Sequence, residues 1–207
     1  MHAEGHGATT PAPAMTQEGI ILRLPSGQGR LARLSRRLAR AEILSGGVLV
    51  AVIFALMLAN AVSRGFGRPL IWTDELAVHL MVWLAFIGGS AAVALKGHMV
   101  MGLLPEILSP RAAARLALVT DLLVLLFLAT MAAVIWRWLD LPGLIRAGSG
   151  AALAQHSFNF IYTDPTLTLG LHKIWFWLVM PVTVLTAGIH ALAAVAEDLA
   201  CLRGKAP

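Results

Sequence analysis

Residues 76–95 read LAVHLMVWLAFIGGSAAVAL, twenty positions without a single Lys, Arg, Asp or Glu. An α-helix needs about 20 apolar residues to cross the hydrocarbon core of a bilayer. Three more apolar runs lie at about 43–62, 116–136 and 174–196, of which only 116–136 contains a charged residue, Asp121. We therefore predict an all-α integral membrane protein with four transmembrane helices. The composition agrees, because only 13% of the residues are charged, against about 25% in an average soluble domain.

A basic segment precedes the first of these runs. Residues 30–40 read RLARLSRRLAR, with leucines three and four positions apart and arginines around them. This pattern is typical of a short amphipathic helix on the membrane surface, which we expect to bind anionic lipids. Aromatic residues do not alternate with the basic ones, as a nucleic-acid stacking platform would require. We therefore assign the net charge of +5 to the membrane and expect no nucleic-acid partner.

The remaining segments complete the predicted organisation. Residues 1–29 are rich in Gly, Ala, Pro and Thr and predict a disordered tail. Residues 41–199 form the four-helix domain, and 200–207 a second tail. Ala59-Asn60-Ala61 resembles a signal-peptidase site, but more than forty residues precede the first apolar run. An uncleaved span is therefore favoured.

The distribution of positive charge predicts that both termini face the cytoplasm. In that orientation eleven of the sixteen Lys and Arg lie on the cytoplasmic side, as the positive-inside rule requires. The five outside are Arg64, Arg68, Arg137, Arg146 and Lys173. The same orientation places tryptophans at the outer membrane–water boundary, where amphipathic rings are enriched. These are Trp72, Trp136, Trp138, Trp175 and Trp177.

One face of the second run carries its polar and aromatic side chains. They are spaced three or four apart, so they share one side of a helix: Trp72, Glu75, His79, Trp83, Phe86 and Ser90. Such a face should contact protein or water, because a carboxylate or imidazole is costly in lipid. Glu75 and His79 could form a proton relay or ion site. The favoured interpretation is a structural seam facing a partner, because no further ionisable group follows deeper in the run.

Other residues in the runs receive structural interpretations. Gly88 and Gly89 would allow another helix to approach closely. Asp121 lies one turn inside the third run, and Lys96, His98 and Arg115 are expected nearby on the same side of the membrane. An ion pair that joins the second and third helices is the natural assignment. Pro181 should kink the fourth helix and free one carbonyl.

Two other classes of function stay open. The first alternative is the membrane anchor of a redox enzyme that holds haem or quinone. It is suggested by His79 and His190, because two histidines from different spans can ligate one haem. Their predicted depths differ too much for a single haem. A stand-alone channel or carrier is the other alternative, although no inverted repeat is present. No nucleotide-binding loop or catalytic motif occurs in the sequence, so we expect no enzyme activity, no cofactor and no metal.

The stretch from Trp72 to Leu104 resembles the small membrane subunit of the tripartite ATP-independent periplasmic (TRAP) transporters, a DctQ-like family. The resemblance rests on the acidic pair Asp74-Glu75, the mid-run Trp83, the following Gly88, and Lys96-Gly97-His98. Residues from about 41 to 199 follow the family's plan of four spans.

This resemblance implies a non-catalytic subunit of the bacterial inner membrane that anchors a large permease subunit, on which the substrate and sodium sites lie. It also implies a periplasmic binding protein that delivers an organic anion, commonly a carboxylate. The segment 137–173 is longer than the family minimum, and its semi-apolar part, 150–162, is expected to form a helix at the interface. We expect this segment to contribute to docking of the binding protein.

Overall fold

The computed structural model describes residues 29–95 and 109–203. Four long helices are each apolar enough to cross a membrane: α1 (Arg30–Gly65), α2 (Ile71–Ala94), α4 (Pro110–Leu139) and α8 (Val179–Leu202). Three short helices lie between the last two: α5 (Leu141–Ala147), α6 (Gly150–Ser157) and α7 (Ile174–Trp177). The described residues thus confirm the prediction of an all-α membrane protein with four spanning helices.

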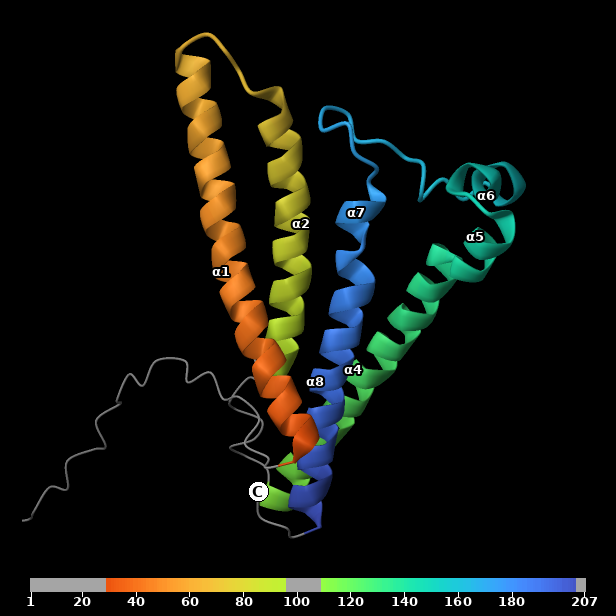
Figure 1. Cartoon of the computed structure of the whole chain (residues 1–207). Helices are drawn as coiled ribbons and strands as arrows, with labels where there is room; N and C mark the ends of the chain where they lie inside the picture. The colour runs from red at the N-terminus through yellow and green to blue at the C-terminus, as the bar shows by residue number, and fades with distance from the viewer. Residues whose placement is uncertain (1–28, 96–108, 204–207) are drawn as a thin grey trace, which may run out of the picture.

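The long helices gather at one end of the molecule and spread apart at the other (Figure 1). α1 packs along α2, α4 packs along α8, and α2 and α8 join the two pairs. We call the gathered end the arginine end, because it carries the basic residues 30–40. The spread end is the tryptophan end, where the α1–α2 turn lies, together with α5, α6 and α7.

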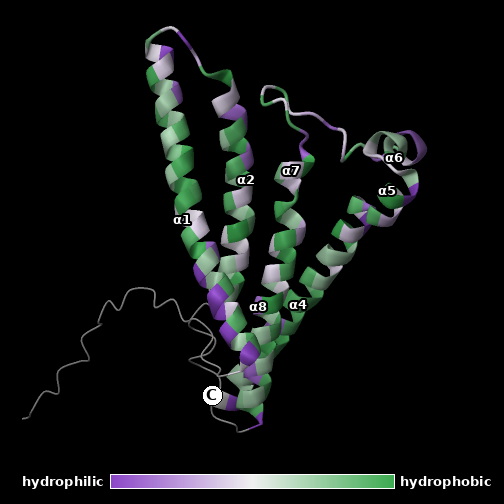
Figure 2. Cartoon of the chain, in the orientation of Figure 1, coloured by the Kyte–Doolittle hydropathy of each residue, from purple (hydrophilic) through white to green (hydrophobic). Residues whose placement is uncertain are grey.

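The outward faces of the long helices are apolar. Figure 2 shows hydrophobic residues along their lengths and hydrophilic residues concentrated toward their ends. Large side chains such as Leu44, Phe54 and Leu126 are well exposed in the isolated chain. A helix that is hydrophobic all round belongs in a membrane or a large core. The small buried core, which includes Leu128, Ala187 and Ala191, lies where α4 and α8 cross near α2.

The basic segment 30–40 is not a helix of its own, which corrects our expectation. It forms the first turns of α1, which continues to Gly65. No glycine or proline separates Arg40 from Ile43, so nothing breaks the hydrogen-bond ladder there. Ser35 and Ala39 are fully buried, and α1 contacts α8. These contacts align the segment with the span.

The predicted tails are only partly covered by the structure. Residues 1–28 and 204–207 lie outside the described residues. Residues 200–202, which we had assigned to the C-terminal tail, belong to α8. The last spanning segment is also divided: α7 ends at Trp177 and α8 begins at Val179. Pro181 follows closely, and it has no N–H to donate to the Trp177 carbonyl.

Candidate functional site along helix α2

Asp74 fastens the start of α2 to the end of α1. Its carboxylate accepts a hydrogen bond from the Asn60 amide at 2.6 Å and pairs with the Arg64 guanidinium at 2.7 Å. Asn60 is buried, whereas the ion pair is half exposed. An exposed pair contributes little on its own. The buried amide supplies the specific contact that fixes the α1–α2 turn.

Glu75 points to a different element, the loop that precedes α7. Its carboxylate accepts backbone hydrogen bonds from Leu167, Thr168 and Leu169 at 2.7, 2.6 and 3.2 Å, and another from the Thr168 hydroxyl at 2.6 Å. Hydrogen bonds to a charged acceptor are stronger than those between neutral groups. Glu75 therefore holds this loop against the end of α2.

His79 and Trp83 hold α7 against α2. The Trp83 indole N–H donates to the Phe176 carbonyl at 2.7 Å, beside the interruption in the last spanning segment. The His79 ring lies 4.1 Å from the Phe176 ring, and its Nδ1 contacts the Glu75 carbonyl at 2.7 Å. A carbonyl oxygen only accepts, so this nitrogen carries the proton.

A buried polar network joins α1, α2 and α8 toward the arginine end. The Glu42 carboxylate accepts a hydrogen bond from the Ser90 hydroxyl at 2.7 Å and contacts His190 Nε2 at 3.1 Å. The other ring nitrogen of His190 contacts the Ser35 hydroxyl at 2.7 Å. Ser90 is also bonded to Thr186 at 2.8 Å. A buried carboxylate needs such partners to offset its desolvation.

Glu42 was missed by the sequence reasoning, which began the first span at Ile43. A usable signal was present, because Ser35 and Glu42 are two turns apart and share a helical face. An ionisable residue beside a spanning run should be examined by default, because it seldom faces lipid. Its partner His190 lies 148 positions away in the sequence, and no local pattern connects the two.

These contacts favour the structural interpretation of the second run over a proton relay. Glu75 and His79 lie toward the tryptophan end and bind backbone groups, whereas Glu42 and His190 lie toward the arginine end. Both ring nitrogens of His190 contact protein groups, so neither nitrogen is available to bind haem iron in this arrangement. Glu75, Trp83 and Ser90 on the polar face of α2 contact other elements of the same chain, and a contact of the face with a partner stays a prediction.

The other predicted residues have varied surroundings. Nothing described lies within 4 Å of a Cβ built on Gly88 or Gly89, so neither glycine serves a close helix contact among the described residues. Asp121 is buried on α4. Lys96 and His98, two of its expected partners, lie outside the described residues. Trp72 is 41% exposed at the tryptophan end.

The segment between α4 and α7 is closed by hydrogen bonds to the end of α4. The Asn159 amide donates to the Trp138 carbonyl at 3.0 Å, and the Tyr162 hydroxyl donates to the Leu139 carbonyl. Burial raises the pKa of Tyr162, and the nearby Asp140 carboxylate raises it further. A phenol is protonated at neutral pH in any case, and that of Tyr162 is the donor to the Leu139 carbonyl. The helix expected within 150–162 is α6.

Comparisons with known proteins relate this chain to a family of membrane transporters. A family model described as "Tripartite ATP-independent periplasmic transporters, DctQ component" matches residues 53–201. The chain is also 38% identical over 64 residues to the "Sialic acid TRAP transporter permease protein SiaT" of Haemophilus influenzae (strain 86-028NP). That similarity covers 30% of this chain and only 10% of the relative. No solved structure matches the chain.

Replacing Glu75 with Ala should release the loop that precedes α7. The amides of Leu167, Thr168 and Leu169 would lose their shared acceptor, so their hydrogen–deuterium exchange should accelerate by about tenfold or more, as loss of about 1.4 kcal/mol of local protection implies. Asp74→Ala is the matched control, since it removes the neighbouring carboxylate but leaves these amides bonded. Equal exchange in both variants would contradict the assignment.

Replacing Glu42 with Ala should strip His190 and Ser90 of their common partner. We expect the free energy of unfolding in detergent to fall by about 3 kcal/mol, measured by reversible denaturant unfolding. Thr130→Ala serves as control, because that hydroxyl bonds only the Leu126 carbonyl of its own helix, and it should change stability by less than about 0.5 kcal/mol.

A double-mutant cycle tests the pairing itself. Glu42→Gln and His190→Gln, made singly and together, should show a coupling energy of about 1 kcal/mol. Strictly additive effects would mean that the two side chains do not stabilise the bundle as a pair.

Proposed function

Because the chain belongs to the DctQ component family of the tripartite ATP-independent periplasmic transporters, we propose that it is a non-catalytic small permease subunit that scaffolds a large permease subunit. A scaffold must hold a fixed shape in the membrane without carrying the substrate itself. The chain's internal contacts supply such a shape. It is a multi-pass membrane protein. Polar contacts join α2 to α1 and α7 near the tryptophan end and join α1, α2 and α8 near the arginine end.

The observation that carries this proposal is the engagement of the polar face of α2. A carrier that works alone needs ionisable groups near the bilayer midplane and helices broken around a binding site. Here Glu75 binds the loop before α7, and Ser90 joins Glu42. These side chains are committed to holding helices together and support a static role.

We further propose that the complex takes up an organic acid delivered by a periplasmic binding protein and uses an ion gradient, with sodium as the candidate ion. The family supports this class of transport. The relative is named as a sialic acid transporter, and sialic acid is a carboxylate. A segment similar to this chain occupies one tenth of that permease, which supports close contact between this chain and a larger permease.

The same proposal includes the orientation in the bacterial inner membrane. The arginine end would face the cytoplasm, and the tryptophan end the periplasm. The segment from α5 to α7 would then lie on the side from which the binding protein arrives. Exposed apolar residues there, such as Ile145 and Leu167, would suit docking of a soluble protein.

The single cysteine tests this orientation. Cys201 is exposed close to the end of α8, so a membrane-impermeant maleimide should label it in inside-out vesicles and leave it unlabelled in intact spheroplasts. Leu167→Cys in a Cys201→Ser background provides the reverse control, because Leu167 is 90% exposed at the other end. Labelling of Cys201 in spheroplasts would invert the topology.

Purification from the native membrane tests the scaffold role. An affinity-tagged chain in mild detergent should retain a much larger multi-span permease in a constant ratio, and the complex should show no Soret absorbance. If the chain purified without any permease but with a Soret band, the scaffold role would be wrong and a redox anchor would be favoured.

The same complex should recruit the periplasmic binding protein, and deletion of 150–162 should weaken that recruitment.

A further inference from the structure

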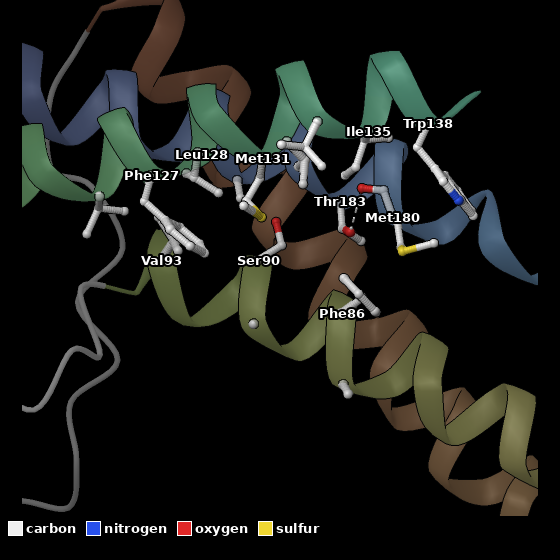
Figure 3. Close-up of a pocket in the computed structure, with 16 residues that line it drawn as sticks. Phe86, Ser90, Val93, Phe127, Leu128, Met131, Ile135, Trp138, Met180 and Thr183 are labelled. Carbon is white, nitrogen blue, oxygen red and sulfur yellow. Dashed lines mark hydrogen bonds between the residues drawn. The ribbon is translucent and has the colours of Figure 1, made fainter. Parts of the chain in front are cut away.

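A groove of about 820 Å³ lies between α2, α4 and α8, where α4 leaves the bundle. Figure 3 shows Phe127 and Met131 of α4 facing Phe86 and Ser90 of α2 across this space. The two hydroxyls in its lining are already engaged, since Ser90 donates to Glu42 and Thr183 to the Val179 carbonyl. The groove therefore offers an occupant almost nothing but apolar contact.

A second cavity, of about 400 Å³, lies at the tryptophan end. It is lined by aromatic rings together with the Asn159 amide and the Asp164 carboxylate. Asp164 pairs with Lys173 at 3.0 Å, so the Lys173 ammonium lies beside the cavity although it is not part of the lining, and charges of both signs are close to it. Aromatic faces beside a carboxylate suit an ammonium group, while an amine such as that of Lys173 suits a phosphate.

Trp138 belongs to the lining of both cavities, so the two adjoin at this residue. Its ring lies 5.4 Å from the ring of Trp177. Both indoles are half-buried, as is typical of rings that sit where apolar and polar surroundings meet. Polarity therefore changes from one cavity to the other, from charged and aromatic at the tryptophan end to apolar between the helices. We call the two adjoining cavities together the path.

We propose that this path is a binding site for one zwitterionic phospholipid. An acyl chain lies in the groove between α2, α4 and α8, and the headgroup lies at the cavity of Trp138, Trp177 and Asp164. An amphiphile matches both the change in polarity and the presence of both charges. A transmembrane helix of a partner, which is apolar along its length, would leave the charged end of the path unmatched.

Two neighbouring glycines provide a matched test. Gly89 lines the groove and Gly88 does not, yet a Cβ added at either meets nothing within 4 Å. Leucine at position 89 should fill the groove without a clash, whereas leucine at position 88 carries the same helix propensity and bulk away from it. Gly89→Leu should therefore displace the acyl chain, and Gly88→Leu should not.

The full-length protein would be placed in vesicles of phosphatidylethanolamine and phosphatidylglycerol that contain a phosphatidylethanolamine with a photoreactive acyl chain. We expect labelling of peptides that carry Phe127, Met131 and Met180. Gly89→Leu should abolish this labelling, and Gly88→Leu should preserve it. Labelling that is unchanged in Gly89→Leu, or spread evenly over outward residues such as Phe54, would overturn the proposal.

A second measurement keeps the test independent of how Gly89→Leu folds. A photo-crosslinking amino acid at Met131 would be activated in the complex purified from native membranes. An added mass equal to a phospholipid supports the site. A crosslink to a larger polypeptide, or to a second copy of this chain, would show that a protein helix occupies the groove and would refute the lipid assignment.

Discussion

A carboxylate inside a helical bundle must be surrounded by donors, and the arginine end of this protein is arranged around that requirement. Glu42 enters from α1, and the groups that satisfy it come from α2 and α8. A contact of this kind works only in one register, since a shift of α8 by a single residue would turn His190 away. The apolar surfaces of three helices in a membrane have no comparable preference, because lipid tails are as apolar as leucine. Polar contacts therefore decide how α1, α2 and α8 align.

At the tryptophan end, too, carboxylates are satisfied by donors from other elements of the chain. The adjacent carboxylates of Asp74 and Glu75 point to different elements, one to α1 and the other to the loop before α7. Trp83 then supplies a donor to the Phe176 carbonyl, at the point where Pro181 weakens the helix. Helix α2 is thus bound to its neighbours at several depths, and each bond replaces a contact that water would make outside the membrane.

The sequence alone predicted the four spans, because hydrophobic run length is a property of each segment by itself. It also identified the polar face of α2, because a spacing of three and four places residues on one side of a helix. It did not identify what that face contacts. Leu167 and His190 lie far from their partners in the chain, and many pairings of four helices would satisfy the same pattern.

Two misjudged features share one cause. Glu42 was read as flanking sequence and 30–40 as a separate helix, because both judgements assumed that a span begins where charge ends. In the structure the helix starts earlier, and its charged turns are buried against α8 on one side. Ser35 and Glu42 lie on the same face of α1, and their contacts favour a continuous helix. The missed role of Glu42 and the missed continuity of 30–40 with the first span therefore have the same origin.

Helix α4 lies at the edge of the bundle, beside α8 (Figure 1). It packs along α8, and Val93 of α2 packs against the small core that includes Leu128 and Ala187. Beyond that point α2 and α4 diverge toward the tryptophan end (Figure 1). In a bilayer such a gap cannot remain empty, because its walls would lose the dispersion contacts that lipid provides elsewhere. The groove between α2 and α4 is therefore filled in the membrane, and its apolar lining suits an apolar occupant.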